Sequence, residues 1–169
     1  MTKESNKGYS LVELIVIIAI MVIIVSGTIL GVSAISGKPA EHAASDLRTT
    51  IQNYRTLALG KYTTTLEIKV ESTGLEVTAE YQVDASATPV TKKIHICGPE
   101  VLVEYSAFDN EDGDGTYGSF PDSGVIIDFN RSTGGINGGN MMYCFKFTKA
   151  GKSYRVLLYS LTGKSELYR

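Results

Sequence analysis

An uncharged apolar run from Leu14 to Ile35 constrains this chain of 169 residues more than any other feature. Isoleucine, valine and leucine dominate the run, and one carboxylate, Glu13, directly precedes it. A helix rises about 1.5 Å per residue, so the run would extend roughly 33 Å, enough to cross the hydrocarbon core of a bilayer. An ionised carboxylate at the edge of such a segment is costly unless it meets a partner. Glu13 is therefore a candidate functional residue.

The rest of the chain is long enough for one globular domain with its own core. Frequent tyrosine, threonine, valine and glycine there are typical of an exported, β-rich domain. The formal net charge is −2, from 16 basic and 18 acidic residues, so a broadly basic surface for nucleic acid is not expected.

The first eight residues form a polar leader, in which Lys3 and Lys7 favour a cytoplasmic location for this end. An ordinary secretory signal would place a small-residue cleavage site after the apolar run. The run is long for a signal core, and a carboxylate at its start serves no purpose there. These features argue against an ordinary signal peptide.

The junction between the leader and the run reads Gly8-Tyr9-Ser10-Leu11-Val12-Glu13-Leu14. This motif resembles the class III signal of type IV pilins and pseudopilins. The resemblance implies cleavage by prepilin peptidase after Gly8 and methylation of the new amine on Tyr9. It also implies that Glu13 pairs with the N-terminus of a neighbouring subunit during filament assembly. Such a pairing makes physical sense, since two unpaired charges in an apolar layer are each expensive.

A second helical pattern follows Pro39, which is expected to kink or re-cap the helix. Apolar side chains then recur at three- and four-residue spacings, at Ala40, Ala43, Ala44, Leu47, Ile51, Tyr54 and Ala58. This pattern predicts an amphipathic helix over 38–60, with one face packed on a sheet and Gly60 as a stop.

The remaining residues, 61–169, are expected to form an antiparallel sheet. Strands are predicted at Thr63 to Glu71, Leu75 to Val83, Lys92 to Cys97, Val101 to Ser106, Val125 to Asn130, Met141 to Thr148, Tyr154 to Ser160 and Ser165 to Tyr168. The predicted fold class is α+β and pilin-like, with a long N-terminal α-helix whose hydrophobic half spans the membrane and whose amphipathic half packs on the sheet. The predicted parts are a leader (1–8), a hydrophobic helix (9–37) and a globular domain (38–169).

Two C-terminal segments carry a weaker resemblance. Ile126 to Gly134 and Val156 to Lys164 are similar to paired segments of minor pilins and pseudopilins. This resemblance favours a minor or initiator-type subunit over a bulk fibre subunit.

Two other groups of residues are candidates for chemistry. Cys97 and Cys144 form the single cysteine pair of an exported chain, which predicts one disulfide; two separate buried thiols are the alternative. Asn110, Asp112 and Asp114 alternate as in part of a calcium loop, but Pro121 stands at the twelfth position where a bidentate glutamate is needed, so a solvated acidic turn is the alternative.

The sequence does not predict an enzyme. His42 and His95 are the only histidines, and they have no zinc-site spacing. No nucleophile-elbow motif is present, and no cofactor is expected.

The leading interpretation is a structural subunit of a type IV pilus or pseudopilus. Before assembly it would be a single-pass protein of the cytoplasmic membrane, and afterwards part of an extracellular pilus or envelope pseudopilus. Its partners would be prepilin peptidase, other pilin subunits, the membrane and the assembly platform. The alternative is a binding module for DNA or adhesion carried by such a filament, using basic residues such as Arg131, Lys146, Lys149 and Lys152. A signal-anchored surface protein that never polymerises is a further alternative.

Overall fold

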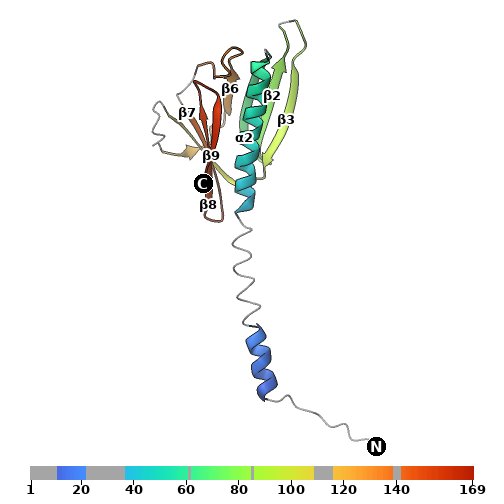
Figure 1. The fold of residues 1–169 in the computed structure, drawn as a ribbon, viewed down its shortest axis with the longest axis vertical. Coiled ribbons are helices and arrows are strands. Elements are labelled where there is room, and N and C mark those ends of the chain that lie inside the picture. The colour runs from blue at the N-terminus through green and yellow to red at the C-terminus, as the bar shows by residue number, and fades with distance from the viewer. Residues whose placement is uncertain (1–10, 22–36, 61, 85, 109–115, 139–141) are drawn as a thin grey trace, which may run out of the picture. The chain divides into compact units, whose positions relative to one another are not determined.

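The computed structural model describes residues 11–21, 37–60, 62–84, 86–108, 116–138 and 142–169 (Figure 1). The contacts between residues divide the chain into two units, Met1–Ser36 and Gly37–Arg169. The first unit contains the apolar run, and the second unit contains the strands. Each unit is described by itself below.

The described part of the first unit is a helix over residues 11–21. The predicted fold class is corrected for this unit by the following finding. Among the residues whose structure is described, no helix is both long and apolar enough to cross a membrane. The predicted long spanning helix is therefore contradicted, and the predicted localisation as a single-pass membrane protein, which depended on that helix, is contradicted with it.

The second unit begins with helix α2 (Lys38–Leu59), which corresponds to the amphipathic helix expected over 38–60. Pro39 occupies its first turn, where a missing backbone N–H costs nothing. The apolar stripe of α2 is buried, and its members are Ala40, Ala43, Ala44, Leu47, Ile51, Tyr54 and Ala58. Most of these are alanines, whose small side chains let the helix backbone approach the strands closely.

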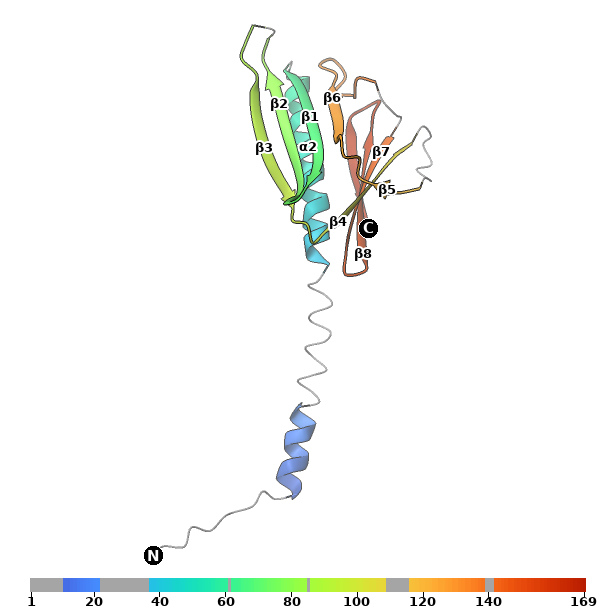
Figure 2. The ribbon, with the colours of Figure 1, turned by 180° about the vertical axis from the view of Figure 1, so that it is seen from behind.

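The strands of the second unit form two antiparallel sheets (Figures 1 and 2). The first sheet has the order β3-β2-β1-β6 and the second has the order β5-β4-β7-β8-β9. The strands are β1 (Thr63–Glu71), β2 (Gly74–Gln82), β3 (Val90–Cys97), β4 (Leu102–Phe108), β5 (Gly118–Ser119), β6 (Val125–Phe129), β7 (Met142–Lys149), β8 (Lys152–Tyr159) and β9 (Lys164–Tyr168). The chain passes to the second sheet at β4, returns to the first at β6, and ends in the second. Neither sheet is therefore continuous in sequence.

The protein is accordingly α+β with two antiparallel sheets, where the sequence predicted one. α2 contacts β1 and β3 of the first sheet and β7, β8 and β9 of the second, so a single helix covers both. Strand patterns in a sequence show which residues alternate, but they do not show which strands pair. The short strand β5 was not predicted, because two residues carry no alternating pattern.

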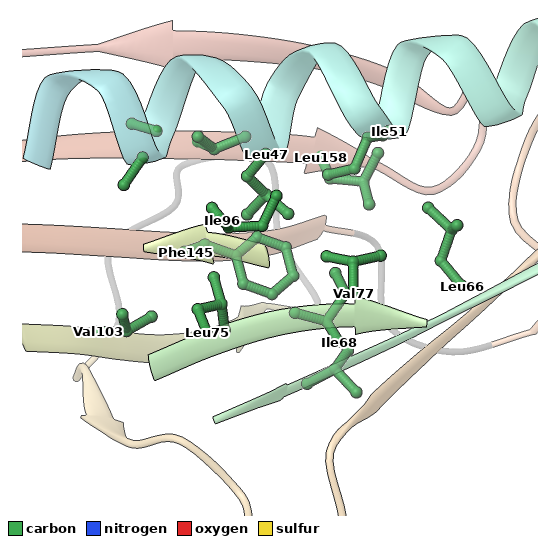
Figure 3. Close-up of a cluster of buried hydrophobic side chains, with 14 of the residues drawn as sticks. Leu47, Ile51, Leu66, Ile68, Leu75, Val77, Ile96, Val103, Phe145 and Leu158 are labelled. Atoms are coloured by element: carbon green, nitrogen blue, oxygen red, sulfur yellow. The ribbon is translucent and has the colours of Figure 1, made fainter. Parts of the chain in front are cut away.

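The core of the second unit joins α2 to both sheets. Leu47 and Ile51 of α2, Leu66, Ile68 and Val77 of the first sheet, and Phe145 and Leu158 of the second are all fully buried. Figure 3 shows Phe145 in the middle of this cluster, among side chains from all three layers. Its ring lies 5.7 Å from that of Tyr105 and 6.2 Å from that of Phe120. Hydrophobic packing thus holds the two sheets and the helix together.

Candidate functional site

The helix at residues 11–21 is apolar around its circumference apart from Glu13, and it is called the assembly segment below. All of its side chains are exposed, from 41% for Ile17 to 76% for Leu11 among the large hydrophobic ones. A helix that is hydrophobic on every face belongs in an apolar environment, and an exposed patch of this kind marks an interaction site. The assembly segment is therefore the strongest candidate functional site in the described chain.

Glu13 is the single charged residue of the assembly segment, and its side chain is exposed. No described residue forms an ion pair with it. If the surrounding apolar surface were covered by another molecule, this carboxylate would be covered as well and would need a partner of opposite charge. Gly8 and Tyr9, the predicted cleavage and methylation positions, lie outside the described residues.

The two C-terminal segments that resemble paired pilin segments lie side by side in the structure. The loop at 130–137 packs on the β8–β9 turn at 160–163, and these two stretches are called the loop junction. The Ile136 amide donates a hydrogen bond of 2.7 Å to the carbonyl oxygen of Ser160. Within the loop, the amides of residues 132 and 133 donate to the side-chain oxygen of Asn130, at 2.9 and 3.2 Å. Strand patterns alone did not predict this contact between the sheets.

Close backbone approach is the main feature of the loop junction. A Cβ on Gly135 would lie 2.6 Å from the carbonyl oxygen of Leu161, and one on Gly163 would overlap the carbonyl oxygen of Gly134. Arg55 of α2 donates a hydrogen bond of 2.8 Å from Nε to the carbonyl oxygen of Thr162. The junction therefore joins the two sheets at the C-terminal end of α2.

Next to the junction, strand β9 carries a carboxylate with three hydrogen-bond donors. Lys164 Nζ lies 2.6 Å from Glu166 Oε1, while the hydroxyls of Tyr168 and Tyr159 donate to Oε2 at 2.5 and 3.3 Å. The hydrogen bond from Lys164, followed by that from Tyr168, lowers the pKa of Glu166 from 4.5 to about 2. This charge network ties β9 to β8 on the outer face of the second sheet.

The network makes the stability of the chain sensitive to acid. Because the pKa of Glu166 is lower in the folded state, its contribution to stability is complete above pH 4.5 and is lost as the pH falls toward about 2. We expect the Glu166→Gln variant to lose less stability than the wild type between pH 4.5 and 2, measured by chemical unfolding at a series of pH values. Parallel losses in the two proteins would contradict this assignment.

The predicted disulfide between Cys97 and Cys144 is absent, and both residues are buried free thiols. Cys97 belongs to the main core, whereas Cys144 belongs to a small cluster with Phe108 and Met142. Cys144 neighbours Phe145 on β7, so the two side chains point to opposite faces of the second sheet. Because Phe145 occupies the core, Cys144 points away from it and from Cys97. Burial raises the pKa of both thiols.

The other predicted site residues do not form a site in the described chain. The calcium candidates Asn110, Asp112 and Asp114 lie outside the described residues. His42, on α2, and His95, on β3, are both exposed. Over the described ranges, no group of three or more His, Cys, Asp or Glu side chains is arranged to hold a metal ion.

Two of the four basic residues proposed for DNA binding are paired with carboxylates. Lys146 Nζ lies 2.7 Å from Glu104 Oε2, and Lys149 Nζ lies 3.7 Å from Glu100 Oε1. Arg131 lies in the loop after β6, and Lys152 begins β8. Since carboxylates neutralise two of the four charges, the structure offers no specific support for the DNA-binding alternative.

Sequence reasoning missed one concave surface of the globular unit. A pocket of about 450 Å³ opens where the end of β1 meets β4 and the segment that follows β5. It is lined by Val70, Leu102, Val103, Glu104, Ser119, Phe120, Pro121 and Asp122. The lining residues come from three separate stretches of the sequence, so no local pattern could have revealed the pocket.

Comparisons with known proteins found no relative: no protein-family model matches the chain, and no curated protein or solved structure is significantly similar to it.

Proposed function

We propose that this chain is a structural subunit of a type IV pilin-like filament, processed after Gly8 by prepilin peptidase and methylated at Tyr9. The observation that carries the proposal is the assembly segment, an apolar exposed helix with Glu13 as its single charge. An apolar helix of this kind favours burial among copies of itself in a filament core, where hydrophobic area is removed from water.

In such a core, Glu13 has the role of a register residue. Cleavage after Gly8 frees an amine four residues before Glu13, and this amine is the natural counter-charge for the carboxylate of a neighbouring subunit. A pair buried in this way is satisfied only when the two subunits are in one axial register. Breaking a buried pair by removing one partner costs about 3–5 kcal/mol, because it leaves an uncompensated charge.

The support for a pilin-like subunit extends to the globular unit. Its helix α2 packs on antiparallel sheets, and the two C-terminal segments that resemble paired pilin segments join at the loop junction. That junction favours the minor-pilin or pseudopilin form of the proposal. Among the described residues there is no group of side chains arranged to hold a metal ion, and Lys146 and Lys149 of the DNA-binding alternative are paired with carboxylates.

The proposal is tested by the Glu13→Ala variant of the full chain, expressed with the wild-type subunit and its assembly machinery. We expect incorporation into sheared filaments to fall by about 100-fold or more, the factor that corresponds to losing one partner of a buried pair. Quantitative immunoblotting of filament and cell fractions measures the ratio.

Asp46→Ala is the matched control, because Asp46 is an exposed carboxylate of α2. It should leave incorporation unchanged. The intact mass of wild-type subunits in the filament fraction should correspond to a chain that begins at methylated Tyr9. Normal incorporation of Glu13→Ala, or an N-terminus elsewhere, would overturn the proposal.

A further inference from the structure

A second concave surface lies where helix α2 runs beside β3, the edge strand of the first sheet (Figures 1 and 2). Its volume is about 300 Å³, at the lower end of the range for sites that bind small molecules. It is called the tyrosine pocket, and none of the described residues that line it is acidic. They are Thr50, Asn53, Tyr54 and Leu57 of α2, Tyr81 of β2, and Lys92 and Ile94 of β3.

Regular secondary structure positions the groups of the tyrosine pocket. The four residues from α2 follow one another at spacings of three, one and three, so they form one stripe along the helix. On β3, Lys92 pairs with Ala79, and Ala79 is fully buried. Ile94 pairs with Val77, which is also fully buried. Because paired residues share one face of a sheet, both side chains of β3 stand on the inner face, at the open edge.

Two hydroxyls of the pocket belong to buried residues and have no hydrogen-bond partner among the described residues. Thr50 is 8% exposed and Tyr54 is 6% exposed. On the same helix, Thr49 and Thr56 donate to the carbonyl oxygens four residues earlier, at 2.8 and 2.9 Å, whereas Thr50 does not. Neither unpaired oxygen is sealed inside the protein, so a molecule in the pocket can reach both. Since buried polar groups are normally paired, these hydroxyls point to a ligand that supplies the partners.

The pocket also contains a positive charge that no described carboxylate neutralises. Lys92 forms no ion pair with a described residue. The adjacent Lys93, on the opposite face of β3, lies 3.4 Å from Glu76 and 3.9 Å from Glu71. A lysine ammonium has three hydrogen-bond donors and no acceptor, so the group that it binds best is an anion.

Aromatic rings form another part of the pocket wall. The rings of Tyr54 and Tyr81 lie 6.2 Å apart at an angle of 49°, and the ring of Tyr62 lies 6.3 Å from that of Tyr81. Burial, and then the neighbouring Tyr81 phenol, raise the pKa of Tyr54, so its hydroxyl stays neutral and can both donate and accept. Flat apolar faces beside hydroxyl groups suit a ligand whose ring has C–H groups on its face and oxygens around its rim. A sugar ring has both properties.

We propose that the tyrosine pocket binds an acidic monosaccharide, with its carboxylate beside Lys92 and its ring hydroxyls bonded to Thr50 and Tyr54. An aromatic acid of similar size would satisfy the lysine but would leave the two buried hydroxyls without partners. A neutral sugar would leave the ammonium without an anion. This binding activity goes beyond the proposed filament function, because the pocket shares no residue with the assembly segment.

Saturation-transfer-difference NMR on the full chain in detergent micelles tests this inference. The probes are glucuronate, galacturonate and N-acetylneuraminate, and glucose and benzoate are the comparison ligands. At least one sugar acid should bind saturably with a dissociation constant of about 1 mM or less. Glucose and benzoate should bind at least about 10-fold more weakly, because each lacks one of the two kinds of contact.

Two variants and one matched control locate the binding. Lys92→Ala should weaken binding of the sugar acid about 10-fold, the factor that corresponds to a hydrogen bond to a charged group. Tyr54→Phe keeps the ring, removes the hydroxyl and should weaken binding about 5-fold. Lys93→Ala removes the adjacent lysine of β3 and should leave binding unchanged. Circular dichroism spectra equal to that of the wild type verify that the variants are folded.

The outcomes that overturn the inference are distinct from those that overturn the proposed function. Absence of saturable binding by all three sugar acids overturns it, and so does equal weakening by Lys92→Ala and Lys93→Ala. Benzoate or glucose binding as tightly as the sugar acids overturns the assignment of the ligand class. Incorporation into filaments is measured separately and should be normal for Lys92→Ala, so failure of sugar binding leaves the proposed function in place.

Discussion

The Phe145→Ala variant is expected to lose about 3–5 kcal/mol of unfolding free energy. Phe145 is fully buried, and its ring packs against Tyr105 and Phe120 in the middle of the core. Its removal leaves a cavity shared by α2 and both sheets (Figure 3). Because the neighbours belong to three different layers, they cannot all move inward to fill the space, and the loss should lie toward the upper end of this range.

Urea unfolding of the full chain, followed by tyrosine fluorescence and circular dichroism, measures this loss. Phe145→Leu keeps most of the buried volume and should cost roughly half as much or less. Leu161→Ala, at a position 77% exposed, should change stability by no more than about 0.5 kcal/mol. A loss below about 1 kcal/mol for Phe145→Ala would show that the two sheets do not share this core.

The Gly163→Ala variant, at the loop junction, is also expected to lose a large part of the unfolding free energy. Gly163 has a φ of 62°, in the left-handed region, and an added Cβ would overlap the carbonyl oxygen of Gly134. The left-handed conformation costs an alanine about 1–2 kcal/mol, and overpacking adds about 1–3 kcal/mol. We therefore expect a total loss of about 2–5 kcal/mol.

Gly151→Ala is the matched control, because Gly151 is also in a turn between strands with a left-handed φ, of 74°, but a Cβ added there would meet no atom within 4 Å. This variant should lose only the unfolding free energy that the left-handed conformation costs an alanine, about 1–2 kcal/mol. The difference between the two variants then measures the contact between residues 134 and 163. Equal losses would mean that the loop junction is not packed as described.

Local patterns predicted much of the globular unit. The three- and four-residue spacing of apolar side chains located α2, and alternation located eight of the nine described strands to within a few residues. Glu13 was likewise identifiable, because a single charge in an apolar run is a feature of neighbouring residues. The helix and the strands can be predicted because side chains on one face recur at a fixed spacing along the sequence, about 3.6 residues in a helix and two in a strand.

Local patterns could not predict which strands pair or which side chains surround each residue in the folded unit. The return of β6 to pair with β1, the division into two sheets, and the opposite orientations of Cys97 and Cys144 depend on contacts between residues far apart in the chain. The long spanning helix was predicted from length and hydropathy alone, and the described helix at 11–21 contradicts it.

The order of residues is enough to show which segments of the globular unit are helical or extended, and where the lone charge of the apolar run lies, because backbone periodicity is a local property. Long-range contacts in the folded unit establish how the strands divide between two sheets, which thiols remain apart, and where Val70, Leu102 and Asp122 come together. These contacts escape local patterns because burial of apolar area is non-directional. Burial selects whichever pairing of strands fills the core around α2 and Phe145, and that choice involves the whole unit at once.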